Sequence, residues 1–119
     1  MDTKQILELV VKAADSRKAH NIVALNMAQI SLVADYYVIM DASSPRQVKA
    51  IANAIVEAAK KNDVDMHDVE GMDTAKWVLV DLNGVLVHIF DHETRNFYNL
   101  EKLWSDAPRV DVSKWLTED

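Results

Sequence analysis

Cysteine is absent from the 119 residues of the chain, and glycine and proline occur only twice each. Without cysteine the chain can form no disulfide and no thiolate nucleophile, which fits a reducing, cytoplasmic environment. Gly71 and Gly84 are too few to build the glycine-rich loops that cradle phosphate groups. Because the apolar runs are short and the N-terminus leads into an amphipathic stretch, the sequence predicts neither a membrane span nor a secretion signal.

The charge is distributed unevenly along the chain. Residues 1–60 carry seven Lys/Arg and six Asp/Glu, whereas residues 61–119 carry six Lys/Arg and thirteen Asp/Glu. An acidic surface repels phosphate backbones and attracts basic partners. Direct nucleic-acid binding is therefore disfavoured. Either a basic protein partner is bound, or the acidity only keeps the domain soluble.

Half of the residues are hydrophobic, enough for the core of one small domain, and their spacing predicts two long helices. Apolar residues at helical spacing predict a first helix over about residues 4–18, capped by Thr3. A second helix is predicted to begin after Ser44, with Pro45 at its first position and Gln47 completing a capping box.

The strongest local signal is Asn83-Gly84, which lies between two β-rich runs and predicts a type I′ hairpin. Its register would place Leu82 opposite Val85, Val80 opposite Val87 and Val78 opposite Ile89, on one aliphatic face. The other face would carry Trp77, Leu79, Asp81, Leu86, His88 and Phe90. We therefore expect the hairpin to lie centrally in a sheet, with helices over one side.

Weaker patterns complete the predicted elements. Strands are expected at residues 22–25 and 35–41, with a short one near 64–67. A last short helix is predicted over 96–104, with Phe97, Leu100 and Trp104 on one face. The organisation expected is one domain of residues 1–107 and a short C-terminal tail, 108–119, with Val112, Trp115 and Leu116 as its anchors.

No set of residues suggests catalysis or a metal. Asp63 and Asp65 resemble the carboxylate pair of a nucleotidyl-transferring enzyme, but no Gly-Ser phosphate loop precedes them, which favours a solvated acidic turn. His88 and His92 are four residues apart but would lie on a strand and beyond its end, so they should not share a metal. No cofactor and no metal ligand is therefore predicted. Asp81 and His88 lie diagonally on one hairpin face, where a hydrogen bond between them is an open alternative to a plain structural pair.

The mixed face of the hairpin is the remaining candidate. Trp77, His88 and Phe90 are residue types found where proteins meet. Burial of the same side chains beneath the last helix is an equally open interpretation.

Several stretches of the chain carry a family resemblance. They are Asp35-Tyr36-Tyr37-Val38-Ile39, 43–47, Trp77-Val78-Leu79-Val80-Asp81, 84–90, Arg95, Phe97-Tyr98 and Leu100-Glu101-Lys102-Leu103-Trp104. Together they resemble the bacterial ribosomal silencing factor family, RsfS or Iojap. The resemblance implies an α/β (α+β) fold: a mixed β-sheet flanked by helices, nucleotidyltransferase-like without the catalytic motif.

The resemblance also implies a function without catalysis. Such a factor binds the large ribosomal subunit through ribosomal protein fourteen, blocks joining of the small subunit and lowers translation when nutrients are scarce. The expected partner-binding residues are Trp77, Asp81, His88, Arg95 and Tyr98. An incompletely covered aromatic face further predicts a homodimer when the protein is free. A cryptic nucleotidyltransferase-like nucleotide-binding protein and an RNA-binding module are the alternatives.

Overall fold

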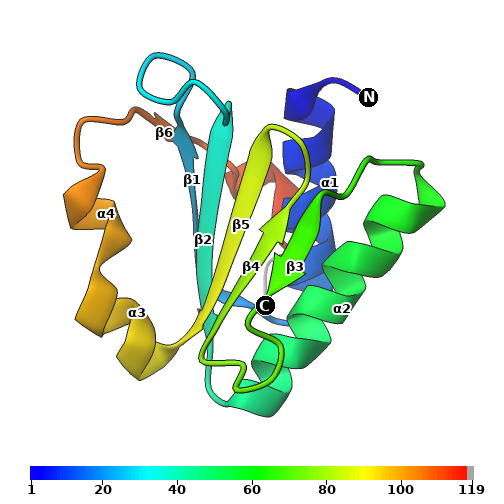
Figure 1. Ribbon diagram of the computed structural model, residues 1–119, viewed down its shortest axis with the longest axis vertical. Helices are drawn as coiled ribbons and strands as arrows, with labels where there is room; N and C mark the ends of the chain where they lie inside the picture. The colour runs from blue at the N-terminus through cyan, green and yellow to red at the C-terminus, as the bar shows by residue number, and fades with distance from the viewer. Residues whose placement is uncertain (118–119) are drawn as a thin grey trace.

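The computed structural model describes residues 1–117, and within them a six-stranded mixed sheet has the order β3-β4-β5-β2-β1-β6 (Figure 1). The strands are β1 His20–Asn26, β2 Tyr36–Ala42, β3 Asp68–Glu70, β4 Trp77–Asp81, β5 Val85–Asp91 and β6 Arg109–Val110. The helices are α1 Thr3–Ser16, α2 Pro45–Lys61, α3 His92–Tyr98 and α4 Leu100–Leu103, followed by the 3₁₀ turn η1 Ser113–Trp115. The predicted mixed sheet flanked by helices is confirmed.

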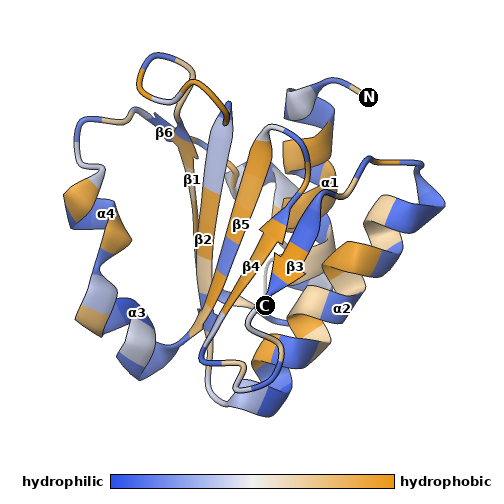
Figure 2. Cartoon of the chain, in the orientation of Figure 1, coloured by the Kyte–Doolittle hydropathy of each residue, from blue (hydrophilic) through white to orange (hydrophobic). Residues whose placement is uncertain are grey.

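Helices cover the two faces of the sheet unequally. The long helices α1 and α2 pack side by side on one face, and the short helices α3 and α4 lie over the other (Figure 1). Figure 2 shows hydrophobic residues along β4 and β5, whereas the helices mix hydrophobic and hydrophilic residues. The larger core cluster lies beneath α1 and α2, and the smaller one lies beneath α4.

The hairpin prediction is confirmed in detail. Asn83 and Gly84 both have positive φ, 51° and 106°, as a type I′ turn requires. Val78 pairs with Ile89 and Val80 pairs with Val87, and both pairs are buried beneath the long helices. Since β5 also pairs in parallel with β2, the hairpin is internal to the sheet.

The two long helices lie where periodicity places them, but their caps differ from expectation. Asp2, not Thr3, caps α1: its side chain accepts from the N–H of Gln5, and the Gln5 side chain accepts from the N–H of Asp2. A carboxylate at that position can accept the orphan N–H of the first turn. Ser44 caps α2 with Pro45 behind it, as predicted. The capping box is incomplete. Its second bond should run from the N–H of Ser44 to the Gln47 side chain, but Gln47 Oε1 accepts from the N–H of Ser43.

The strands predicted near residues 22–25 and 35–41 are confirmed as parts of β1 and β2. The one predicted near 64–67 is wrong. The N–H of Val64 still bonds back to the carbonyl of Ala59 at the end of α2, so the chain reaches the sheet later. Pairing begins only where Asp68 lies opposite Asp81.

The single helix predicted over 96–104 is also wrong. Asn99 has a left-handed backbone, φ 46°, which ends α3 and starts α4 in a new direction. Leu100 and Trp104 pack against the smaller core, but Phe97 is 81% exposed. A side chain from the first short helix therefore points away from the face expected for it.

The C-terminal segment is tied to the sheet and to the first helix. β6 pairs with β1, and Val112 and Trp115 are buried in the larger core, as expected for anchors. Leu116 is only partly buried there. Residues 118–119 of the expected tail lie outside the described residues. Within residues 1–117, no helix is long and apolar enough to cross a membrane.

Candidate functional site

Strand alternation gives the β4–β5 hairpin one face that the long helices do not cover. We call this the aromatic face, formed by Trp77, Leu79, Leu86, His88 and Phe90 together with Tyr98 of α3. The ring centroid of Trp77 lies 5.0 Å from that of Phe90 and 4.7 Å from that of Tyr98. Phe90 is buried, Trp77 is half-buried and Tyr98 is exposed. The rings thus form a graded stack from the core to the surface, as aromatic anchors at interfaces do.

His88 supports this stack from within the sheet. Its side chain is 6% exposed, and its Nδ1 accepts a hydrogen bond of 3.2 Å from Nε1 of Trp77. The rings of Tyr37 and Phe90 lie at 5.0 Å and 6.3 Å. Desolvation by burial lowers the pKa of His88 to about 4, so the imidazole is neutral at pH 7.

The hydrogen bond considered between Asp81 and His88 does not form. Asp81 Oδ1 instead accepts from the N–H of Asn83 at 3.2 Å, within the hairpin turn. The indole of Trp77 occupies the acceptor nitrogen of His88. Asp81 lies opposite Leu86, at the turn end of the hairpin. Two residues of the same face separate it from the aromatic stack. Its carboxylate therefore bonds to the backbone of the hairpin turn and not to His88.

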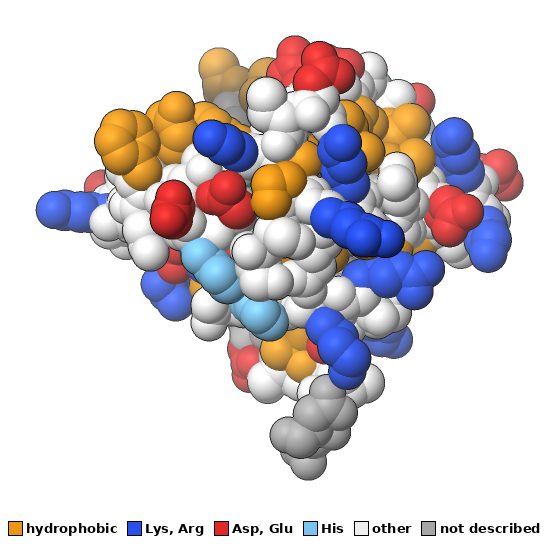
Figure 3. Space-filling model, turned by 90° about the horizontal axis from the view of Figure 1, so that it is seen from below, with side chains coloured by type: hydrophobic (Ala, Val, Ile, Leu, Met, Phe, Trp, Pro, Cys, Tyr) orange, Lys and Arg blue, Asp and Glu red, His pale blue; other side chains and the backbone are white. Residues whose placement is uncertain are grey.

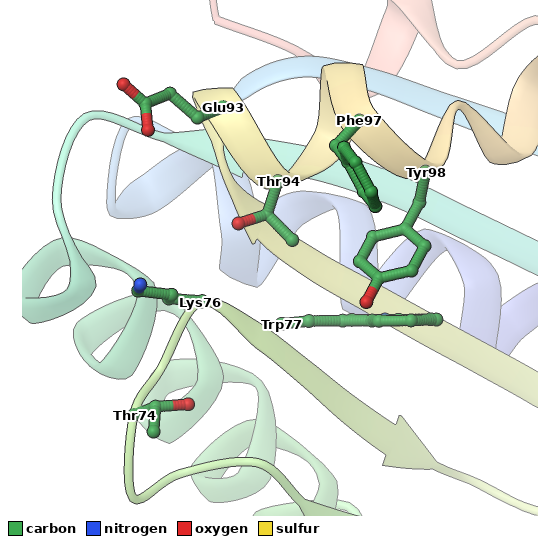
Figure 4. A pocket seen from close by; sticks show the side chains of 7 residues that line it. All are labelled: Thr74, Lys76, Trp77, Glu93, Thr94, Phe97 and Tyr98. Atoms are coloured by element: carbon green, nitrogen blue, oxygen red, sulfur yellow. The ribbon is translucent and has the colours of Figure 1, made fainter.

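A cleft of about 530 Å³ opens beside Trp77 (Figure 4). One wall is the loop before β4, with Thr74 and Lys76. The other wall is α3, which contributes Glu93, Thr94, Phe97 and Tyr98. Figure 4 shows the indole edge-on with the Tyr98 hydroxyl pointing toward it. The cleft therefore offers a partly apolar hollow of side-chain size next to an aromatic anchor.

Arg95 fixes the helix that carries this wall. Its guanidinium donates to the carbonyl of Asn21 at 2.6 Å, to Asp41 at 2.9 Å and to Glu101 at 2.9 Å. The residue is 7% exposed. Arg95 therefore joins α3 and α4 to the ends of β1 and β2 and does not itself present a surface.

Carboxylates line the β3 edge of the same face. In the register of β3 and β4, Asp68 lies opposite Asp81 and Glu70 lies opposite Leu79. Opposite residues of an antiparallel pair project on the same side of the sheet. We call Asp68, Glu70 and Asp81 the acidic edge; it borders the aromatic face where β3 pairs with β4, at one edge of the sheet.

The predicted site residues thus divide into two groups. Trp77, Asp81 and Tyr98 are at least partly exposed on one side of the molecule, whereas His88 and Arg95 are buried behind them. Sequence reasoning missed Phe97 as an exposed residue and missed Asp68 and Glu70 altogether. Alternation along β3 would have given both acids, but three residues are too few for the pattern to be recognised.

Other candidates lie elsewhere. Asp63 and Asp65 are exposed, and Asp65 lies 3.3 Å from His67. In the described part of the chain, the one group of three side chains close enough to share a metal ion is His20, Asp41 and His92. It lies at the ends of β1, β2 and β5, outside the aromatic face.

Comparisons with known proteins agree with this architecture. The family model for the ribosomal silencing factor during starvation matches residues 1–119. The ribosomal silencing factor RsfS of Bacillus subtilis is 48% identical over 112 residues, which are 94% of this chain and 95% of that protein. A crystal structure from Bacillus halodurans has a TM-score of 0.82 at 42% identity, covering 91% of this chain and 98% of its own. Another from Chromobacterium violaceum has a TM-score of 0.86 at 31% identity, covering 88% of each chain. Sequence and fold together place the chain in the ribosomal silencing factor (RsfS) family.

Proposed function

We propose that this chain binds the large ribosomal subunit through ribosomal protein fourteen and thereby blocks joining of the small subunit. Translation would then fall when nutrients are scarce. The proposed action is binding alone, in the cytoplasm, without catalysis. Membership of the RsfS family supports the link to the ribosome.

The observation that carries the proposal is the half-open aromatic face beside an acidic edge. The ring centroids of Trp77 and Tyr98 lie 4.7 Å apart beside a cleft, and Asp68, Glu70 and Asp81 border the same side of the sheet. Interfaces concentrate binding energy in aromatic anchors seated in pockets, with charged residues at the rim. Carboxylates at the rim favour a basic partner, and ribosomal proteins contact a phosphate backbone with basic surfaces.

The five residues expected at the interface take different roles in this proposal. Trp77 and Tyr98 contact the partner directly, and Asp81 pairs with a basic side chain at the rim. His88 and Arg95 position them, since His88 holds the indole by a hydrogen bond and Arg95 holds α3 against the sheet.

The test is pelleting of the protein with purified large subunits, with light scattering to follow subunit joining. Tyr98→Ala should reduce both binding and inhibition of subunit joining, because it removes the exposed ring that lies against Trp77. Leu32→Ala is the matched control, since Leu32 is a fully exposed apolar side chain on the loop between β1 and β2. Equal binding by wild type and Tyr98→Ala would contradict the assignment of this face.

A titration with ATP and magnesium separates this function from nucleotide binding. Neither ligand should bind, and Asp63→Ala combined with Asp65→Ala should leave ribosome binding intact. Both carboxylates are exposed, so the double variant should fold. Metal-dependent nucleotide transfer that is lost in the double variant would replace the proposal with an enzymatic one.

Free in solution, the protein is proposed to form a homodimer through the same face. Phe97 and Tyr98 are exposed there, and two-fold pairing is the commonest way to cover such a patch. Dimerisation and ribosome binding would then compete, and the bound species would be a monomer. Sedimentation of the protein alone and with its ribosomal partner tests this, because a dimer that stays intact on the partner excludes a shared face.

A further inference from the structure

The ends of β2 and β5 form a topological switch point, a place where open sheets often bind ligands. These two strands are parallel neighbours, and the chain leaves them toward opposite faces of the sheet: β2 leads into α2, and β5 leads into α3 (Figure 1). Open sheets bind ligands outside the carboxyl ends of strands at such a reversal. Asp41 lies near the end of β2, and His92 directly follows β5.

Three potential ligand side chains meet at this switch point. One ligand atom from each of His20, Asp41 and His92 lies within 4.8 Å of the others. Nδ1 of His92 is 2.7 Å from Oδ1 of Asp41, and Nδ1 of His20 is 4.0 Å from the same oxygen. The two imidazole rings stack in parallel, 5° apart in orientation and 5.3 Å between centroids. Figure 3 shows histidine side chains gathered in one patch on the underside of the molecule.

A β-bulge places His20 at this position. His20 pairs with Asp41, but the register of β1 shifts before Val23, and Asn21 within the shift has φ 52°. Bulges of this kind redirect a side chain, and they are frequent next to functional sites. The irregular strand thus holds an imidazole over the end of its neighbour.

Asp41 has one oxygen engaged and the other available. The residue is 3% exposed, and its Oδ2 accepts from Arg95 at 2.9 Å. Oδ1 is buried and accepts no hydrogen bond of acceptable geometry, although the ring of His92 lies against it. A buried carboxylate oxygen without a hydrogen bond is costly, and a cation in contact with it removes that cost.

We propose that His20, Asp41 and His92 bind a divalent transition-metal ion of the zinc type. Two imidazole nitrogens and one carboxylate oxygen are a usual protein ligand set for zinc, with water in the fourth position. Tetrahedral ligands about 2.0–2.1 Å from the ion lie about 3.3 Å apart. The observed 2.7 Å and 4.0 Å bracket that spacing, so both rings need to move by less than about 1 Å. Their side chains are 46–49% exposed and free to do so.

The ion pairs around Asp41 are balanced, so the proposed site depends on its ligand atoms and not on an excess of negative charge. Arg95 pairs with both Asp41 and Glu101, and Arg109 lies 3.7 Å from Glu101, so two guanidinium groups balance the two carboxylates. A bound ion would also join β1, β2 and α3 at a single point. This metal-binding inference does not rest on the proposed ribosome contact, because all three ligands lie outside the aromatic face.

The test is isothermal titration of the chelator-treated full chain with Zn²⁺. One ion per chain should bind, and Zn²⁺ should raise the melting temperature. His20→Ala and His92→Ala should each weaken binding at least tenfold, and His20→Gln and His92→Gln should do the same with the ring volume largely kept. His67→Ala is the matched control, since His67 is half-exposed beside Asp65 and Asp81 but belongs to no such group.

Cobalt provides a second reading, because Co²⁺ bound to these ligands should absorb visible light with the intensity of a tetrahedral site. The absorption should disappear in His92→Gln and persist in His67→Ala. Absence of Zn²⁺ binding by the wild type, or equal binding by wild type, His20→Gln and His92→Gln, would overturn the proposal. Circular dichroism of each variant confirms that a folded protein was titrated.

Discussion

Trp77 and His88 are joined across the hairpin by a hydrogen bond of 3.2 Å from the indole Nε1 to the imidazole Nδ1. Because Nδ1 accepts, the neutral ring carries its proton on Nε2, which is buried without a hydrogen-bond partner in the described structure. A second proton would set an imidazolium N–H against the indole N–H. The half-buried ring of Trp77 therefore depends on a histidine that must stay neutral.

The stability of the protein should fall with pH in a window defined by His88. The folded pKa of His88 is about 4 because burial penalises its charged form, and its ordinary value is 6.5. Between these values the unfolded chain binds the proton and the folded chain does not, so stability is full above about pH 6.5 and decreases as pH falls toward 4. Protonation of His88 should lower the free energy of unfolding by roughly 3 kcal/mol across this window. Chemical denaturation from pH 7 to pH 4 measures it.

His88→Asn is the variant for this comparison, since an asparagine oxygen can accept the same indole N–H. Its free energy of unfolding should decline less steeply over the window than that of the wild type. A constant difference between the two proteins at every pH would mean that His88 does not titrate as burial predicts.

Alanine substitutions of Trp77 and Trp115 should have different effects, the first on ribosome binding and the second on stability. Trp77→Ala should weaken binding to large subunits by about 2 kcal/mol or more, roughly thirtyfold, because it removes an anchor of the aromatic face. Trp115 is buried against α1, so Trp115→Ala should cost about 3–5 kcal/mol of stability and leave the affinity of the folded fraction unchanged. Thermal melts beside binding titrations measure both. A large drop in melting temperature with normal affinity in Trp77→Ala would make that residue ordinary core.

The acidic edge should act on the rate of association. Asp68→Asn combined with Glu70→Gln should slow binding several-fold at low salt and reduce its dependence on salt, because rim charges steer encounter. Glu57→Gln is the control, a loss of charge at an exposed position of α2 on the other face of the sheet. Stopped-flow rates measured across a salt series decide this, and rates that stay flat in the wild type would exclude steering.

The two glycines should tolerate alanine differently. Both have positive φ, but a Cβ on Gly71 would lie 2.1 Å from the backbone oxygen of Trp77, whereas one on Gly84 would meet the Thr3 side chain at 2.9 Å. Backbone cannot move aside as a methyl group can, so Gly71→Ala should cost roughly 3 kcal/mol and Gly84→Ala clearly less. Urea denaturation compares them. Equal losses would mean that strain from positive φ, not the clash, sets the cost at both positions.

Most of the sheet could be predicted because its signals are local. Asn83-Gly84 determines both the turn and the register of β4 and β5, and the cap at Ser44 identifies the start of α2. β3 and the break at Asn99 could not be predicted in the same way. The first is too short for alternation to be read, and the second depends on a left-handed residue whose neighbours favour a helix.

The sequence could predict which residues share a face of the candidate site, but not how deeply each side chain is buried. Alternation places Trp77, Asp81 and His88 on one side of the hairpin. It does not reveal that the side chain of His88 is buried and that of Trp77 is half-buried. Arg95 was expected at the surface, and its burial follows from contacts with Asn21 and Asp41, more than 50 residues away in sequence. Contacts of that range leave no periodic pattern in the chain.

Contacts between the first helix and the last described segment determine when the core can form during synthesis. Trp115 packs into the core that α1 shares, Thr117 bonds to Asp15, and β6 completes the sheet beside β1. A nascent chain cannot close this core until residue 115 has been translated and has left the exit tunnel. The core described here therefore stays incomplete until that segment has emerged, so a ribosome that has not yet released it meets the domain in an unfinished form.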